Sequence, residues 1–207
     1  MPTTWNPADK TVDCVLSNGN LTARSNQFGN QCVRGTYSVA TGKYYWEYTF
    51  NDTSNSACGI APLSTTLTSI GTTGPGIAAY INGVGGSIFV NTVGLAVLGA
   101  FAAGQIACIA LDLTGQLIWF RKGAAGNWNG SGTANPATGA GGYAVSFVGA
   151  GVAAYALYSS NNATPTGLVT ANFGDSAFAG VVPAGFASGF PGTAAAAAAQ
   201  ARAMVLA

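Results

Sequence analysis

Carboxylates are the first side chains to examine for acid–base chemistry, because the chain contains no histidine. Histidine is the commonest general base, the usual partner of a Ser or Cys nucleophile, and the commonest metal ligand. Glu47 is the only glutamate, and the aspartates are scattered along the chain: Asp9, Asp13, Asp52, Asp112 and Asp175. Glycoside hydrolysis needs two carboxylates roughly 5–9 Å apart, and Glu47 with Asp112 is the pair to consider for it.

Structural roles are the simpler interpretation of these two carboxylates. Glu47 would pair with Arg34 or Lys43, and Asp112 would cap the turn that it begins, as aspartates often do. We therefore predict a protein that is not an enzyme, with no catalytic residue, no metal site and no cofactor.

The cysteines are Cys14, Cys32, Cys58 and Cys108, and their spacing matches no short metal-binding motif. Cys58 and Cys108 lie in apolar runs, which indicates buried free thiols. For Cys14 and Cys32 the sequence leaves both a disulfide and two free thiols open.

Two groups of aromatic and amide side chains have the composition of a sugar-binding site. An aromatic face covers the apolar side of a sugar ring, and amides bond to its hydroxyls. Tyr80 with Asn82 is one such group, and Asn127, Trp128 and Asn129 form the other. The alternatives are that Trp128 anchors its loop on the body of the domain and that Tyr80 is a core tyrosine.

Composition narrows the classes of partner. Of the 207 residues, 49% are hydrophobic and only 6% are charged, against roughly 25% charged in ordinary domains. The formal net charge of +1 provides no field to attract nucleic acid. Low charge weakens repulsion between copies, so we expect a homo-oligomer or a subunit of a larger assembly.

The elements that must position these side chains are strands. From Tyr44 to Phe50, aromatic residues occupy every second position, which predicts a strand with one aromatic face on a core. Further short strands alternate with turns such as the one at Ser17–Asn20. Ile106–Leu111 is apolar on both faces, as expected of a central strand. The pattern predicts an all-β sandwich or barrel.

Two segments raise other possibilities. Val93–Leu111 is apolar, but glycines interrupt it and a turn follows at once, so we predict no membrane span. Residues 193–207 are rich in alanine and should be helical, although so short a helix is marginal alone in water. We expect one sandwich domain over residues 1–192 and a helical tail over 193–207.

Five segments in order resemble SPRY domains. They are Val33–Gly35 with Gly42–Glu47, then Gly59–Ala61, Gly104–Asp112 with Gly115–Phe120, Asn172–Gly174, and Phe178 with Pro183–Phe186. Trp5–Lys10, Leu16–Thr22 and Tyr80–Gly83 are similar to segments of SPRY-like domains in phage tail and virion proteins. The resemblance implies a concanavalin A-like sandwich of two antiparallel sheets that acts as a binding module without catalysis.

These observations lead to one expected function and one alternative. We expect a virion protein, in a tail fibre, spike or capsid decoration, that contacts other virion subunits or a host-surface glycan. The alternative is a lectin-like carbohydrate-binding protein on a bacterial cell surface. In either case Tyr80, Asn82, Asn127, Trp128 and Asn129 are the predicted ligand-binding residues.

Overall fold

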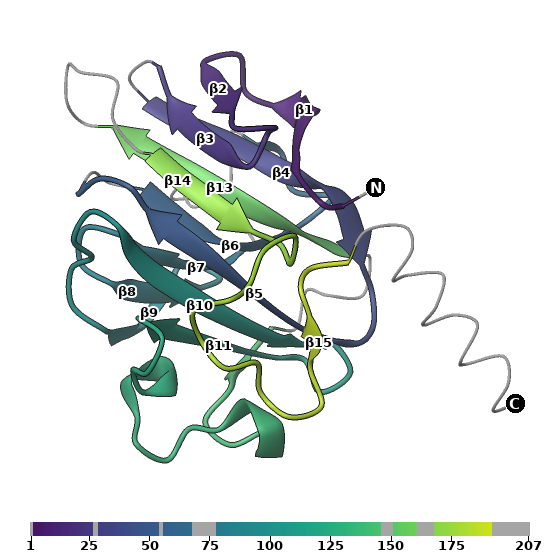
Figure 1. The fold of residues 1–207 in the computed structure, drawn as a ribbon, viewed down its shortest axis with the longest axis vertical. Helices are drawn as coiled ribbons and strands as arrows, with labels where there is room; N and C mark the ends of the chain where they lie inside the picture. The colour runs from purple at the N-terminus through teal and green to yellow at the C-terminus, as the bar shows by residue number, and fades with distance from the viewer. Residues whose placement is uncertain are drawn as a thin grey trace, which may run out of the picture.

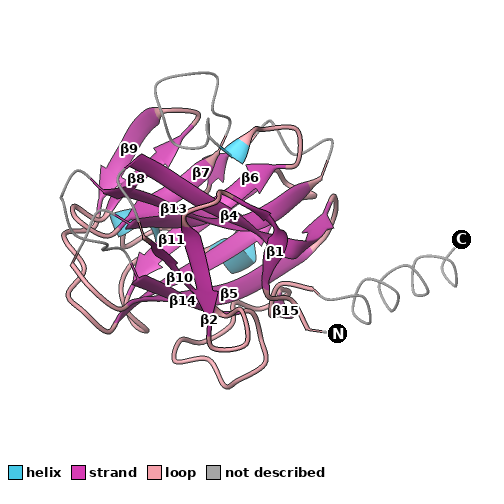
Figure 2. Cartoon of the chain, turned by 90° about the horizontal axis from the view of Figure 1, so that it is seen from above, coloured by secondary structure: helices cyan, strands magenta, loops and turns pink. Residues whose placement is uncertain are grey.

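The computed structural model describes residues 2–26, 29–53, 56–67, 78–145, 151–160 and 168–191, which form two β-sheets packed face to face (Figures 1 and 2). Sheet A runs in the order β1 (Trp5–Lys10), β4 (Gly29–Val39), β13 (Val152–Ser160), β6 (Ser56–Pro62), β7 (Ala79–Asn82), β8 (Ser87–Val90) and β9 (Val93–Val97). Sheet B runs in the order β12 (Tyr143–Ala144), β11 (Leu117–Lys122), β10 (Gln105–Asp112), β5 (Lys43–Phe50), β14 (Leu168–Asn172), β3 (Thr22–Ser25) and β2 (Cys14–Ser17). These strands pair antiparallel, so the predicted two-sheet sandwich is confirmed.

Strand β5 places its aromatic face on the core between the sheets, as the alternation predicts. Trp46, Tyr48 and Phe50 are fully buried, and Tyr44 packs against the same cluster. Trp5, in the edge strand β1 of sheet A, stacks on Tyr48 with ring centroids 5.8 Å apart. The aromatic strand therefore forms the floor on which the remaining core residues assemble.

The opposite face of β5 is also buried, which the sequence did not indicate. Tyr45 is fully buried, and Glu47 is only 4% exposed. Residues 174–186, called the closing segment below, cross this outer face of sheet B (yellow-green in Figure 1). Two short 3₁₀ helices, η2 (Trp128–Gly130) and η3 (Pro136–Thr138), lie in the loop after β11. The covering of both faces explains why Ile106–Leu111 of β10 is apolar on both faces, as predicted for a central strand.

The apolar stretch from Val93 to Leu111 forms β9, a connecting loop and most of β10. In the part of the chain that the structure describes, no helix is long and apolar enough to cross a bilayer.

Three strands were not predicted, and each has a weak local signal. β1 contains Pro7 and lies at one edge of sheet A. Proline lacks a backbone N–H and is tolerated in an edge strand, which has a partner strand on one side alone. β9 is the opposite edge strand of the same sheet. The third, β15 (Ala187–Ser188), has only two residues and pairs in parallel with β5 at Tyr44 and Tyr45.

All four cysteines are buried free thiols, which confirms the prediction for Cys58 and Cys108 and resolves the alternatives for Cys14 and Cys32. Burial raises the pKa of the Cys14 thiol to about 11. The predicted alanine-rich tail, residues 193–207, lies outside the described residues.

Candidate recognition cleft

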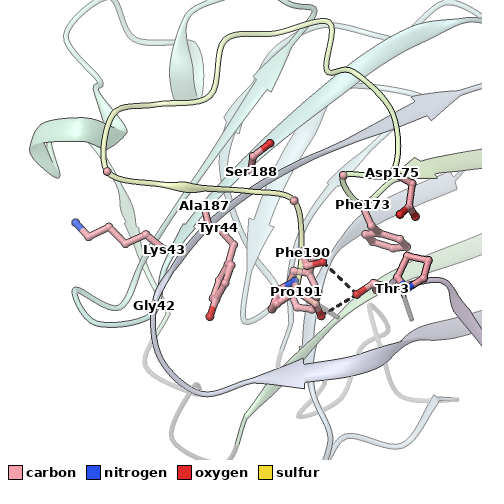
Figure 3. Close-up of a pocket in the computed structure, with 14 residues that line it drawn as sticks. Thr3, Gly42, Lys43, Tyr44, Phe173, Asp175, Ala187, Ser188, Phe190 and Pro191 are labelled. Carbon is pink, nitrogen blue, oxygen red and sulfur yellow. Dashed lines mark hydrogen bonds between the residues drawn. The ribbon is translucent and has the colours of Figure 1, made fainter. Parts of the chain in front are cut away.

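A cleft of about 400 Å³ opens where the start of β5, the end of β14 and β15 meet the N-terminal residues (Figure 3). It lies at the end of sheet B where β14 has stopped pairing with β5 and β15 takes its place. Its principal lining side chains are Thr3, Lys43, Tyr44, Phe173, Asp175, Ser188 and Phe190. Four separate parts of the chain thus contribute to one concave surface, which no pattern within a single segment could predict.

Hydrogen bonds fix the wall of the cleft formed by the chain after β15. The Thr3 hydroxyl donates to the carbonyls of Phe190 and Pro191, at 3.1 and 2.8 Å (Figure 3). The backbone N–H of Gly189 donates to Tyr45 O at 2.8 Å, and that of Phe190 donates to Phe173 O at 2.9 Å. The wall is therefore tied both to the N-terminus and to sheet B.

Two glycines allow the two sides of the cleft to approach closely. Gly189 has φ +99°, and a Cβ there would lie 2.3 Å from Phe173 O. Gly174 has φ +114°, and a Cβ there would lie 2.9 Å from the Cα of Gly189. A larger residue at either position would force the backbones apart and change the shape of the cleft.

Aromatic rings that continue into the core form the floor of the cleft. Phe190 contacts Tyr44, Trp46 and Phe173 with ring centroids 5.9, 5.0 and 6.3 Å apart. The Tyr44 hydroxyl donates to Thr41 O at 2.8 Å, which fixes the ring at the rim. The floor is thus rigid and apolar, with a polar rim.

The backbone of β15 gives the cleft a strand edge whose outer side pairs with no other described strand. In a parallel ladder, alternate residues bond to the same neighbouring strand. Ser188 is the residue opposite Tyr45, and Tyr45 O accepts from Gly189, so the N–H and C=O of Ser188 point away from β5. Ser188 is exposed and lines the cleft. The cleft can therefore offer backbone donors and acceptors beside an apolar floor.

The charged groups at the rim are Lys43 and Asp175. Lys43 pairs with Asp112 at 2.9 Å, and its ammonium lies 5.7 Å from the centroid of the Phe186 ring. Asp175 is exposed. The lining residues include no histidine, cysteine or glutamate.

The two carboxylates considered for glycoside hydrolysis lie apart. Glu47 is opposite Cys108 in the β5–β10 ladder, and Asp112 is opposite Lys43. Four positions along a strand correspond to about 13 Å, beyond the spacing that glycosidases use. The predicted turn cap is confirmed, because Asp112 accepts the N–H of Gly115 at 2.8 Å.

The predicted ion pair of Glu47 with Arg34 or Lys43 is wrong. Glu47 instead accepts from the Tyr45 hydroxyl at 2.6 Å and from the backbone N–H groups of Ala179 and Gly180 at 3.0 and 2.7 Å. Arg34 pairs with Asp9 at 2.7 Å. The closing segment supplies the two backbone partners of Glu47, and its position could not be inferred from residues near Glu47.

A buried polar cluster surrounds Glu47 beneath the closing segment. Arg121 lies 4.4 Å from the Trp128 ring centroid and 3.6 Å from the Cys108 sulfur. Burial raises the pKa of the Cys108 thiol, so it is protonated and a poor nucleophile. Burial also raises the pKa of Tyr45, which therefore remains a hydrogen-bond donor. The cluster holds the closing segment in place and is largely buried, although Glu47 also lines a surface cleft of about 290 Å³.

Trp128 and Asn129 are buried, at 8% and 6% exposure. Asn129 accepts the N–H of Phe120 at 2.8 Å and donates to Gly141 O at 2.8 Å, so it satisfies the edge of β11. Trp128 packs on Arg121 and Tyr45, which agrees with the loop-anchor alternative. Asn127 is exposed and lines a second cleft beside Val97.

Tyr80 and Asn82 lie in the other sheet. Tyr80 stacks on Phe89 with centroids 5.1 Å apart, and it packs against a small cluster on sheet A that includes Cys32 and Ala57. Asn82 accepts from the N–H groups of Gly85 and Ser87 at 3.1 and 3.0 Å and so shapes the β7–β8 turn. The two predicted aromatic–amide groups are therefore built on different sheets.

Among the described residues, no group of three His, Cys, Asp or Glu side chains is placed to bind a metal ion. None of the predicted ligand-binding residues lines the recognition cleft. The one signal available was the turn-rich stretch of glycines and prolines from Gly174 to Pro191.

No family model and no curated protein sequence matches the chain. Among solved structures, it is similar to the SPRY domain of human HERC1, with a TM-score of 0.59 and 14% identity over 81% of this chain and 96% of that one. It is also similar to the TRIM65 PSpry domain, with a TM-score of 0.58 and 13% identity over 83% and 92% of the two chains. These likenesses show that the chain has the fold of SPRY domains.

Proposed function

We propose that this protein is a non-catalytic recognition module that binds an extended segment of a partner protein in the cleft beside β15. The observation that carries the proposal is the outward-facing backbone of Ser188 next to the aromatic floor around Phe190. The SPRY-like fold supports it, because the sequence resemblance to that family implies a binding module.

An extended peptide would use both features of the cleft. Its backbone would add to the edge of β15, and its alternate side chains would enter the apolar floor. Hydrogen bonds from Thr3 and Gly189 already hold the wall of the cleft in place, so binding a peptide costs little conformational entropy of the protein.

The test is selection of peptides from a random display library, followed by calorimetry with the synthesised winners. Ser188→Pro removes the outward N–H while leaving the bonds to β5 intact, and Ser188→Ala retains it. We expect Ser188→Pro to weaken binding about tenfold, equivalent to one hydrogen bond, and Ser188→Ala to bind as the wild type does. Equal binding by all three proteins would refute the proposal.

We propose further that the module sits on a virion and binds another of its subunits. The support is the low charge of the chain and the similarity of Trp5–Lys10, Leu16–Thr22 and Tyr80–Gly83 to phage virion domains. Mass spectrometry of particles purified from cultures of the source organism should find the protein, with a fixed integer number of copies in each particle. Its absence from particles of a producing culture would contradict the virion role.

A host-surface glycan is the alternative partner. Of the five residues predicted to bind a glycan, Asn127 is exposed, Tyr80 and Asn82 are half-buried, and Trp128 and Asn129 are buried. A glycan array probed with wild type and with Asn127→Ala tests this alternative without disturbing the buried Trp128. Specific binding lost in Asn127→Ala would favour the glycan over the peptide.

A further inference from the structure

Strand β9 forms one edge of sheet A (Figure 2), and its outer side carries no further strand among the residues that the structure describes. Its apolar side chains are exposed: Val93 by 58%, Leu95 by 42% and Val97 by 70%. Edge strands of monomeric proteins are usually protected by charged side chains, because an open edge can pair with another chain. β9 carries no such protection.

The lack of charge extends from β9 to the neighbouring strands, and Lys122 lies at the C-terminal end of β9. Residues 53–111, which include β6 to β9, contain no charged side chain. Two copies of this surface would meet without electrostatic repulsion, and a charged partner would find no complementary group on the strand itself.

At Leu95 the pairing of β9 with β8 is interrupted. The register of β8 with β9 shifts between Ile88 and Phe89, where Phe89 faces Gly94 and Ile88 faces Ala96. Leu95 is therefore the extra residue of a β-bulge, and such a residue is left unpaired in the ladder. A strand on the outer side would therefore meet Leu95 at the point where the ladder with β8 is interrupted.

One end of β9 borders a cleft, and the other carries an exposed apolar side chain. A cleft of about 330 Å³ lies at the C-terminal end, lined by Val97, Leu98 and Lys122 on one side and by Gly126, Asn127 and Gly130 on the other. The protruding Val93 lies at the N-terminal end, directly after the turn at Asn91 and Thr92. When a strand pairs antiparallel with its own copy, its N-terminal end meets the C-terminal end of the partner.

We propose that two copies of this chain associate through β9, antiparallel about a two-fold axis at Leu95, so that Val93 of each copy fills the cleft beside Val97 of the other. The two copies of sheet A then form one continuous sheet. A two-fold contact uses the same patch on both copies, which the uncharged and self-complementary β9 allows. The inference does not depend on the recognition cleft, which belongs to sheet B.

Engineered cysteines test both the contact and its register. The four native thiols are buried, so a single introduced cysteine is the only exposed one among the described residues. Leu95→Cys should form a disulfide with its own copy under mild oxidation, because opposed residues of an antiparallel pair lie within disulfide range. Val93→Cys and Val97→Cys should cross-link when mixed with each other. Val12→Cys, in the loop before β2 and 87% exposed, is the control and should remain uncross-linked.

Light scattering after size exclusion, over a range of concentrations, measures the association itself. We expect the wild-type mass to rise to that of two chains and Leu95→Lys to remain at one, with Val181→Lys as a matched control that behaves as the wild type does. Val181 is 81% exposed and lies in the closing segment, away from β9. A wild-type protein that stays at the mass of one chain, together with cross-linking of Leu95→Cys no greater than that of Val12→Cys, would overturn the proposal.

Discussion

The backbone N–H of Gly180 donates a 2.7 Å hydrogen bond to the carboxylate of Glu47, across 133 residues of sequence. The neighbouring N–H of Ala179 donates to the other carboxylate oxygen at 3.0 Å. The only glutamate of the chain therefore holds the closing segment on sheet B. A Cβ on Gly180 would lie 2.5 Å from the Tyr45 hydroxyl and from the Arg121 guanidinium, so a larger residue there would have to displace these two side chains.

Glu47→Gln should loosen the closing segment. The amide NH₂ of glutamine would face at least one donor, either a backbone N–H or the Tyr45 hydroxyl. We expect a loss of about 1–3 kcal/mol in the free energy of unfolding, measured with urea, and faster hydrogen exchange at Ala179 and Gly180. Asp175→Asn makes the same change of charge at an exposed site and should leave both quantities unchanged. Unchanged exchange in Glu47→Gln would contradict the role assigned to this carboxylate.

Asn129→Ala should destabilise the protein, whereas Asn127→Ala should not. The side chain of Asn129 is the acceptor for the buried N–H of Phe120 and a donor to Gly141 O. Its removal leaves a buried donor without a partner, at a cost of about 1–3 kcal/mol. Asn127 is exposed and makes no side-chain cap of η2. Thermal unfolding of the two variants side by side measures the difference, and equal melting temperatures would show that Asn129 is dispensable.

Local patterns predicted the strands whose partners are short-range or whose periodicity is strong. The alternation from Tyr44 to Phe50 gave the core face of β5, and the apolar run of β10 gave a strand covered on both sides. The turn between β2 and β3 followed from Asn18 and Gly19, which both adopt positive φ. In these cases the information lies within a few residues.

The rest of the fold and the whole cleft depend on contacts between distant residues. Burial of Glu47 comes from Ala179 and Gly180, and burial of Trp128 comes from Arg121 and Tyr45. β15 has two residues, too few to show any periodicity, yet it forms the edge of the cleft. A pattern within one segment cannot report which other segment will cover it.

Two glycine variants should separate backbone strain from steric overlap at the recognition cleft. Gly185→Ala and Gly189→Ala both place a side chain at positive φ, +82° and +99°. A Cβ at position 185 meets nothing within 4 Å, whereas one at position 189 lies 2.3 Å from Phe173 O. We expect Gly185→Ala to cost about 1–2 kcal/mol and Gly189→Ala clearly more, as measured by urea unfolding. Equal costs would mean that the two sides of the cleft can separate freely.

Stability should fall as the pH rises above about 9. Burial raises the pKa of the Cys14 thiol from 9.0 to about 11, and burial raises the pKa values of Cys32, Cys58 and Cys108 as well. A group with a higher pKa in the folded state binds its proton more tightly there than in the unfolded chain. Its contribution is complete below the unfolded pKa and is lost as the pH rises through the folded value, here from about 9 to 11 for Cys14.

Urea unfolding at a series of pH values from 7 to about 10.5 would measure this loss, with a slope of at most about 1.4 kcal/mol per pH unit for each such group. Cys14→Ala should flatten the slope between pH 9 and 11, whatever its cost at neutral pH, because one titrating thiol is gone. Tyr45→Phe should flatten it only at higher pH, since burial raises the pKa of that phenol above its ordinary value of 10.0. Stability that stays constant or rises over this range would contradict the raised pKa values of the thiols.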